Sequence, residues 1–346
     1  MKAIARRRED TTADLLVGTV LCHDVRDGAG KIVGHKGQEL DATGAAAVLA
    51  VAWEEIHVIA LDAGDIHEEQ AGARLASAVV GPGVEVKGYI GGQWALAATR
   101  RGLLHVDVAA LAEVNRHGPI SVFTLFDGQP VEPGEIVARA KVTPLVLAET
   151  TVQAVEATAA RARGVVAVTA FRPLTAGAVA RERLDDKQRT RFEAALRQKV
   201  DWVGGSLLPV RYAGATARAV ASDLGALADA GAEVLIVAGA SALDPLDPVF
   251  GGLELMGARM ERHGAPAHPG SLLWLARWKD HVVVGMPTCG MFSQATTFDL
   301  VLPRIFAGAS LGNAELAALG HGGLLSREMA YRFPQYRANA ARGELE

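Results

Sequence analysis

Residues 233–248 have the sequence EVLIVAGASALDPLDP, which joins an apolar run to a loop of small and acidic residues. The run Glu233–Ala238 is the most apolar strand that we predict in the chain, as expected for a strand buried on both faces. Gly239 follows it and allows the backbone to approach a ligand closely. In an open parallel sheet, ligands bind beyond the carboxyl ends of the strands, so we expect a ligand site in this loop.

The loop after this strand contains one hydroxyl and two carboxylates, from Ser241, Asp244 and Asp247. Two carboxylates in one short loop can hold a Mg²⁺ ion that itself sits on phosphate groups. Asp244 and Asp247 are also each followed by proline, which is typical of turn and N-cap residues. The local sequence leaves both interpretations open.

A second loop follows a strand expected at His281–Val284, and its residues are Gly285–Ser293. It leads into a helix expected from about Met291 to Phe306. Exposed N–H groups at a helix start, with small residues and hydroxyls nearby, form an anion site. The alternative is an ordinary turn with a capped helix. Cys289 is a reactive thiol if the helix start lowers its pKa, and otherwise a packing residue.

Strands alternate with helices from Gly164 onward. We expect further strands at Val165–Thr169, Leu207–Arg211 and Ser271–Trp278, and helices near Asp185–Val200, Thr216–Ala230 and Gly252–Arg262. Alternation at this spacing predicts a parallel sheet covered on both faces. We place the first strand of that sheet at Val165–Thr169.

The first half of the chain has a different pattern, which predicts α+β regions rich in strands. The predicted strands are Val84–Ile90, Ile120–Phe126 and Ile136–Val142, and a helix is expected at Val108–Asn115 with Asp107 as its N-cap. We therefore divide the chain into a small α+β region (1–80), a strand-rich accessory region (81–150), an α/β domain (151–330) and a C-terminal tail (331–346).

The composition favours a folded protein that binds neither nucleic acid nor membrane. Of the 346 residues, 50% are hydrophobic and 21% charged, and the formal net charge is −4. A mildly acidic chain lacks the broad positive field of nucleic-acid-binding proteins. No apolar run approaches the ~18 residues of a membrane span, and the basic start is not followed by the apolar core of a signal peptide. We expect a cytoplasmic protein.

Several familiar signatures are incomplete. The two cysteines, Cys22 and Cys289, exclude a disulfide framework and a four-thiolate zinc site. His67-Glu68 begins a zinc-protease motif, but Ala71 stands where the second histidine belongs. The chain also contains no Gly-Lys-Ser/Thr phosphate loop.

An ordered set of segments in the second half does resemble a known family. The segments are the loop 239–247, His268-Pro269-Gly270-Ser271, Gly285-Met286-Pro287, TTFDLVLPR at 296–304 and GHGGL at 320–324. Together they resemble the molybdopterin-binding proteins, which are related to the molybdenum-insertion enzymes and gephyrin. The resemblance covers residues 164 to about 325.

This resemblance implies a three-layer α/β domain with a parallel-rich sheet that binds molybdopterin or its nucleotide form, with Mg²⁺ near the aspartate loop. Asp244 and Asp247 would hold the metal and act in catalysis. The residues that would bind the cofactor are Thr169, Arg172, Gly239, Ala240, Ser241, Pro287, Thr288, Cys289, Gly290 and Ser293. Arg172 stands where the family has a carboxylate, and it suits pairing with a phosphate.

Three functions remain open. The first is an enzyme of molybdenum cofactor biosynthesis, either a molybdotransferase or a nucleotidyltransferase acting on the pterin phosphate with Mg²⁺. The second is a non-catalytic protein that binds molybdopterin and delivers it to a molybdoenzyme. The third is a scaffold that has lost its ligand. Relatives form oligomers, and the alanine-rich helices would suit an interface between copies of the chain.

Overall fold

The computed structural model describes residues 1–162, 164–240, 242–292, 295–334 and 336. The chain divides into two compact units. Unit 1 comprises Met1–Thr99, Val106–Asp127 and Pro133–Ala167, and unit 2 comprises Arg100–His105, Gly128–Glu132 and the chain from Val168 onward. No described helix combines the length and the apolar character that crossing a membrane requires.

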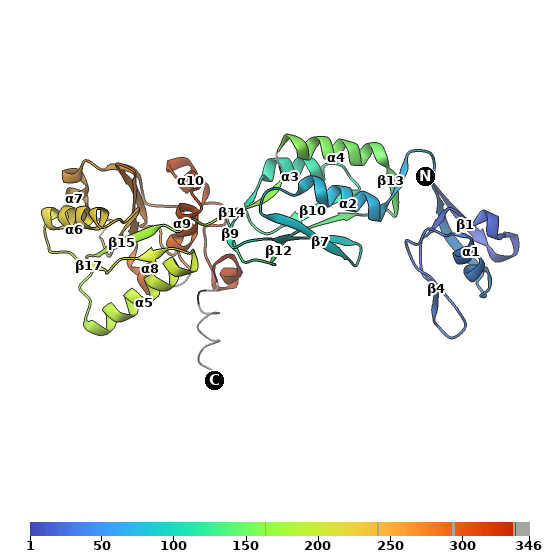
Figure 1. Cartoon of the computed structure of the whole chain (residues 1–346), viewed down its shortest axis with the longest axis horizontal. Helices are drawn as coiled ribbons and strands as arrows, with labels where there is room; N and C mark the ends of the chain where they lie inside the picture. Colours follow the sequence, from blue (N-terminus) through green and yellow to red (C-terminus); the bar gives the residue numbers. More distant parts are fainter. Residues whose placement is uncertain (163, 241, 293–294, 335, 337–346) are drawn as a thin grey trace. The chain divides into compact units, whose positions relative to one another are not determined.

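Unit 1 begins with a small three-stranded sheet of order β1-β5-β2 and a short hairpin, β3–β4 (Figure 1). The elements are β1 (Lys2–Arg7), β2 (Thr19–Leu21), β3 (Val25–Arg26), β4 (Ile32–Gly34), α1 (Ala42–Leu49) and β5 (Glu55–Ala60). Leu16, Leu21, Val48 and Val58 are fully buried against this sheet.

The rest of unit 1 contains a four-stranded antiparallel sheet of order β10-β12-β8-β7, with helices α2, α3 and α4. The elements are β6 (Asp65–His67), α2 (Glu68–Val79), β7 (Val84–Ile90), β8 (Gln93–Ala98), α3 (Val108–Asn115), β10 (Ile120–Thr124), β12 (Ile136–Val142), β13 (Val146–Ala148) and α4 (Glu149–Arg161). Helix α3 has the predicted bounds, and its N-cap is Asp107, whose Oδ1 accepts from the Ala110 N–H at 2.9 Å.

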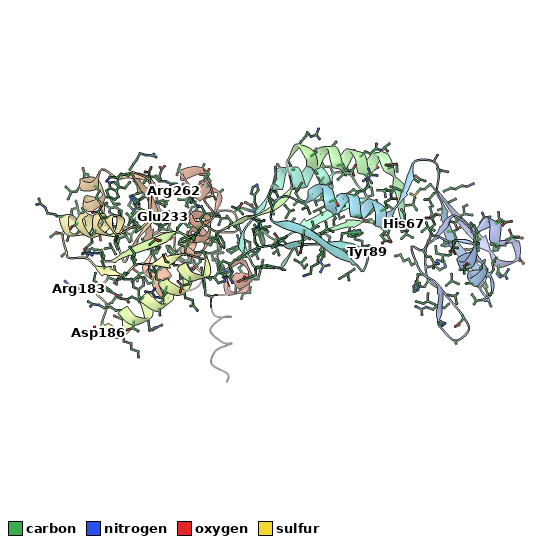
Figure 2. The ribbon with its side chains drawn as sticks, viewed as in Figure 1. His67, Tyr89, Arg183, Asp186, Glu233 and Arg262 are labelled. Atoms are coloured by element: carbon green, nitrogen blue, oxygen red, sulfur yellow. The ribbon has the colours of Figure 1, made fainter. Side chains whose placement is uncertain are left out.

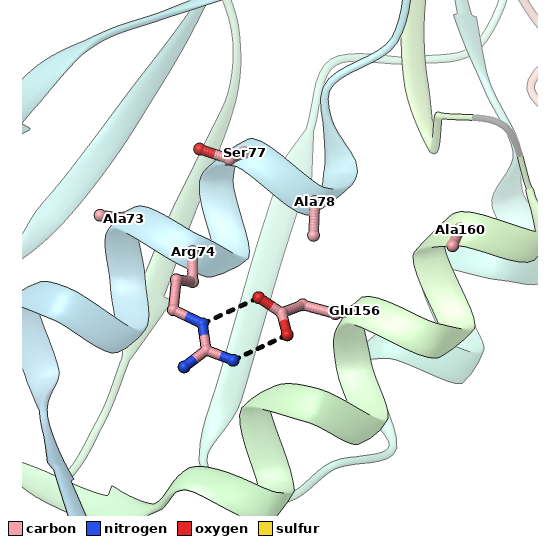
Figure 3. A pocket seen from close by; sticks show the side chains of 6 residues that line it. All are labelled: Ala73, Arg74, Ser77, Ala78, Glu156 and Ala160. Atoms are coloured by element: carbon pink, nitrogen blue, oxygen red, sulfur yellow. Dashed lines mark hydrogen bonds and ion pairs between the residues drawn. The ribbon is translucent and has the colours of Figure 1, made fainter.

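Helices α2 and α4 are held together by charge. Arg74 donates two hydrogen bonds of 2.8 Å to the carboxylate of Glu156 (Figure 3). It donates a third to Glu149. The groove between the helices is otherwise lined by small side chains, Ala73, Ser77, Ala78 and Ala160. The charged side chains of this groove are therefore paired with one another.

Unit 2 is built on a sheet of order β16-β15-β18-β21-β20-β19, with β17 also paired to β15. Its elements are β15 (Thr175–Ala180), α5 (Asp186–Trp202), β16 (Ser206–Leu207), β17 (Arg211–Tyr212), α6 (Ala217–Asp229), β18 (Val234–Ala238), α7 (Pro248–Met256), β19 (Arg259–His263), β20 (Trp274–Trp278), β21 (His281–Met286), α8 (Thr288–Phe292), α9 (Thr297–Phe306) and α10 (Asn313–Ala318). Strands β15, β18 and β21 are parallel to one another. β20 pairs antiparallel with β21 on one side and with β19 on the other. The expected α/β class with a parallel-rich sheet is confirmed.

Successive residues of the central strand β18 face opposite helical layers. Val234 and Ile236 pack in the cluster with α5 and α9, and Leu235 and Val237 pack in the cluster with α6 and α7. Figure 1 shows α6 and α7 on one side of β15 and α5 and α8 on the other. This double burial explains the continuous apolar sequence of the strand.

Three sequence expectations for unit 2 are wrong. The stretch 165–169 belongs to β14 (Val166–Ala170), which joins β9 (Gly102–Val106) and β11 (Pro130–Val131) in a separate sheet. The first strand of the large sheet is β15, which the sequence did not reveal. The expected helix 252–262 is helix α7 followed by strand β19, because Gly257 (φ 70°) ends the helix in the left-handed conformation. The third, a helix from Met291 to Phe306, is the two helices α8 and α9.

We expect Gly285→Ala to destabilise unit 2. Gly285 pairs with Trp274 across β21 and β20, and a Cβ at Gly285 would lie 2.1 Å from the buried Trp274 ring. Overpacking a core of this kind typically costs about 1–3 kcal/mol. Urea denaturation followed by tryptophan fluorescence measures the loss.

Gly225→Ala is the matched control, because Gly225 lies within α6 and a Cβ there meets nothing within 4 Å. This change should stabilise the protein by about 0.5–1 kcal/mol. Equal denaturation midpoints for the two variants would contradict the packing described here.

Candidate functional site

The carboxyl ends of β15, β18 and β21 meet at one edge of the unit 2 sheet. The Arg181 N–H, just after β15, donates to the Ala238 carbonyl at 2.8 Å. The Gly239 N–H, just after β18, donates to the Met286 carbonyl at 3.4 Å. The two loops that the sequence singled out therefore leave the sheet side by side, together with a third loop after β15.

Glu182 lies between the two expected loops. Thr288 donates through Oγ1 to Glu182 Oε2 at 3.4 Å. Gly239 has a φ of 78°, and a Cβ there would lie 2.7 Å from the Glu182 Cβ and 2.8 Å from its backbone nitrogen. Gly239 is therefore required both by its left-handed backbone and by the close approach of Glu182.

Arginines surround this edge. Arg181 donates from Nη1 to the Gly214 carbonyl at 3.1 Å, while its Nε is buried and lacks a hydrogen-bond partner among the described residues. The Arg191 guanidinium lies 5.6 Å from the centroid of the Phe292 ring, which brings α5 against α8. Arg183 and Asp186 follow in the connection from β15 into α5 (Figure 2). The orphaned N–H donor of Arg181 suits an anionic group, within a rim of mixed charge that also contains Glu182 and Asp186.

The other expected residues of these loops differ in exposure. Thr288 and Cys289 are exposed, Pro287 and Gly290 are buried, and Ala240 is half-buried against the α6–α7 layer. Ser241 and Ser293 lie outside the described residues.

Cys289 does not show the activation that a reactive thiol needs. Desolvation raises the pKa of the Cys289 thiol, and the hydrogen bonds from nearby N–H groups only partly oppose this effect. Of the two interpretations that the sequence left open for Cys289, the reactive thiol therefore gains no support, because its pKa is raised and not lowered.

Asp244 and Asp247 are turn and capping residues. Asp244 Oδ1 accepts from the Leu246 N–H, and Asp247 Oδ1 accepts from the Val249 N–H, each at 2.9 Å. Asp247 is the N-cap of α7 and is buried. The described residues contain no group of three His, Cys, Asp or Glu side chains suited to a metal. One oxygen of each carboxylate is thus engaged within the loop, which supports the turn and N-cap interpretation, and the Mg²⁺ site stays a prediction.

Thr169 and Arg172 lie away from this edge. Thr169 belongs to β14, and its carbonyl packs against Gly102 of β9. Arg172 precedes β15, and its N–H donates to the Phe306 carbonyl at the end of α9 at 2.8 Å. The sequence placed these residues wrongly because it took β14 for the first strand of the sheet, so that a loop before β15 was taken for the loop after it.

A buried ion pair that the sequence did not reveal lies beneath the loop after β21. Lys199 of α5 binds Asp299 of α9, and both side chains are buried. Asp299 also accepts from the Thr296 N–H at 3.0 Å, the Thr296 hydroxyl at 2.8 Å and the Tyr336 hydroxyl at 3.0 Å. Both charges are thus neutralised, and the start of α9 is fixed below Gly290, whose Cβ position is 3.4 Å from the Thr296 hydroxyl.

We expect Lys199→Met to lower the free energy of unfolding by about 3–5 kcal/mol, because it leaves the Asp299 carboxylate buried without its cation. Asp299→Asn should cost a similar amount, and the double variant should lose less than the sum of the two. Urea denaturation measures these changes.

Arg211→Met is the control, because the partly exposed pair Arg211–Asp223 should contribute at most about 1 kcal/mol. Additive losses in the Lys199 and Asp299 variants would show that the two residues do not form one unit.

Tyr336 should make stability fall at high pH. Burial and the Asp299 carboxylate raise the pKa of Tyr336 well above its ordinary value. The contribution of Tyr336 to the free energy of unfolding is therefore complete below about pH 10 and is lost as the pH rises further. Tyr336→Phe should reduce the slope of the free energy of unfolding against pH, above about pH 10, by up to about 1.4 kcal/mol per pH unit. A residual slope is expected because the pKa of Tyr212 is raised to about 12. Chemical denaturation between pH 9 and 12 tests this, with the exposed Tyr331→Phe change as control.

No protein-family model and no curated protein matches the sequence. Among solved structures, the chain is similar to a molybdopterin biosynthesis MoeA protein from Pyrococcus horikosii, with 13% identity over 70% of this chain and 79% of that one and a TM-score of 0.30. It is also similar to a NadC deletion mutant, with 11% identity over 53% of this chain and 78% of that one and a TM-score of 0.17.

Proposed function

We propose that the protein binds molybdopterin at the carboxyl edge of the unit 2 sheet and acts in molybdenum cofactor biosynthesis. The observation that carries this proposal is the meeting of the loops after β15, β18 and β21 around Glu182, Gly239 and Thr288. Two of these loops are among the segments whose order in the sequence resembles the molybdopterin-binding proteins.

The chemistry of the edge suits a ligand with an anionic end and a hydrogen-bond-donating end. The Arg181 guanidinium, with its orphaned Nε, suits the phosphate of molybdopterin, since guanidinium groups match phosphate oxygens in geometry and charge. The Glu182 carboxylate accepts hydrogen bonds and suits the amino edge of the pterin ring. The exposed Thr288, whose hydroxyl donates to Glu182, adds a further group that can donate or accept a hydrogen bond.

Binding and delivery to a molybdoenzyme is the function that this geometry supports better than catalysis. Molybdate insertion and nucleotidyl transfer both require the metal assumed at Asp244 and Asp247, and those carboxylates bond to the backbone of their own loop. A holder of the pterin needs the three loops but no such metal, because binding does not require near-attack geometry.

Arg181→Met should weaken molybdopterin binding about 10- to 100-fold, since a hydrogen bond to a charged group contributes about 1.5–3 kcal/mol. Anaerobic fluorescence titration of the purified protein measures the change, after native mass spectrometry identifies any pterin that co-purifies. Arg172→Met is the matched control and should bind as the unaltered protein does, because Arg172 lies before β15.

Titration with and without Mg²⁺ distinguishes a protein that only binds and delivers the pterin from an enzyme that acts on it with Mg²⁺. Binding that is independent of Mg²⁺, without turnover of ATP or molybdate, is expected. Turnover that disappears in Asp247→Ala would instead establish the enzyme, and a protein with no affinity for any pterin would refute both.

A further inference from the structure

A cavity of about 480 Å³ opens in unit 1 at the start of helix α2. It is bounded by the loop of residues 37–39, by His67 and the first residues of α2, and by Trp94 of β8. All of these residues belong to unit 1. The volume lies within the range of about 300–1,000 Å³ that small-molecule sites have. We call this space the α2 cavity.

Hydrogen bonds hold the walls of the α2 cavity together. His67, labelled in Figure 2, is the N-cap of α2, and its Nδ1 accepts from the Glu69 N–H at 3.2 Å. Its Nε2 donates to the Gly37 carbonyl at 2.7 Å. Gln38 accepts through Oε1 from the His35 N–H at 2.9 Å, which fixes the same loop. The cavity is therefore formed by contacts within the chain and can accept a ligand with little rearrangement.

Trp94 gives the α2 cavity an aromatic wall. Its Nε1 is buried against Gly72 of α2, where a Cβ would lie 2.8 Å from that nitrogen, and it has no hydrogen-bond partner among the described residues. The N–H edge of the indole thus faces the helix, so its carbon surface lines the cavity. The Tyr89 ring packs beside it, with the ring centroids 5.5 Å apart. The faces of aromatic rings attract cations, and indole does so most strongly.

The charged groups of the cavity wall are carboxylates. Glu39 and Glu69 are exposed in this wall, and neither forms an ion pair with a residue that the structure describes. No lysine or arginine is among the described residues that line the cavity. An acidic residue in the first turn of a helix, such as Glu69, offsets the positive end of the helix dipole. Glu39 lies before the N-cap of α1, outside any first turn, so its charge has no such role.

The field of the carboxylates extends over the aromatic wall. Desolvation raises the pKa of Glu68, and repulsion from Glu69 adds to this effect. Lys36 and Lys141 oppose it but do not cancel it. Burial and the charges of Glu68 and Glu69 raise the pKa of Tyr89. A cation bound in the cavity would relieve this repulsion.

We propose that the α2 cavity binds a small primary alkylammonium ion. Its three N–H donors match the carboxylate oxygens of Glu39 and Glu69, and its charge lies against the Trp94 ring. A metal ion fits less well, because the carbon wall offers no ligand and the described residues contain no group of three His, Cys, Asp or Glu side chains suited to a metal. An anion would meet two carboxylates in the wall.

Titration of the full-length protein with butylammonium chloride tests the proposal. The protein is labelled with fluorinated tryptophan, and the fluorine resonance of Trp94 is assigned, among those of the five tryptophans, by its loss in Trp94→Phe. This resonance should shift saturably, with a dissociation constant below about 10 mM at constant ionic strength. The resonances of the other tryptophans should stay in place.

Probes of similar size distinguish the charge from the alkyl chain. n-Butanol has the same chain without the charge, and butyrate has the opposite charge, so neither should shift the Trp94 resonance over the same range. Tetramethylammonium has the charge but no N–H donor and should bind at least about threefold more weakly. Nα-acetyl-lysine amide has the same ammonium group, and its affinity relative to butylammonium distinguishes a lysine side chain of a peptide from a free amine.

Glu39→Gln and Glu69→Gln should each weaken butylammonium binding about three- to fivefold, and the double variant about tenfold or more, because each removes one partly exposed ion pair. Glu85→Gln is the matched control, because Glu85 is exposed on β7 of the same unit but outside the cavity wall. It should bind as the unaltered protein does. Circular dichroism confirms that each variant is folded.

A Trp94 resonance that does not respond to butylammonium would overturn the proposal. So would equal responses to n-butanol or butyrate, or unchanged affinity in the double glutamine variant. None of these measurements involves a pterin, and all of the residues concerned belong to unit 1, so their outcome is independent of the function proposed above.

Discussion

The ion pair between Lys199 and Asp299 is the constraint on which the architecture of unit 2 depends. It joins α5 to α9 on one side of the sheet, and Asp299 also binds Thr296 at the start of α9 and Tyr336 near the end of the described chain. Burying two charges costs several kcal/mol, which their attraction offsets only when the remaining hydrogen bonds are also made. All of these groups must therefore assemble together, and their assembly fixes the helix over which the loop after β21 lies.

Local signals made part of this structure predictable. The run Glu233–Ala238 contains its own evidence, because a strand buried on both faces must be apolar throughout. Asp107 before Val108–Asn115 and Asp247 before Pro248 are capping residues that act within one turn of helix. For these elements, the residues that determine the structure are adjacent in the sequence.

The elements that the sequence did not reveal depend on distant contacts. β15 has the sequence TAGAVA, in which alanine and glycine give little strand propensity. Its small residues are needed because a Cβ at Gly177 would lie 2.9 Å from the Cβ atoms of Leu227 and Ala232. Since β15 was not recognised, Arg181 and Glu182 at its carboxyl end were also missed, and Thr169 and Arg172 took their place. Because one strand was missed, the wrong residues were assigned to one side of the predicted site.

The loop between β18 and α7 joins the candidate ligand edge to an apolar cavity beside α7. At its start, Gly239 contacts Glu182 at the ligand edge, and further along, the Ala242 carbonyl binds His263 and Pro245 lines the apolar cavity. Asp244 accepts a hydrogen bond within this loop, and Asp247 caps α7 at its end. The start of α7 and the ligand edge therefore depend on the same short loop, since Asp247 lies only eight positions after Gly239.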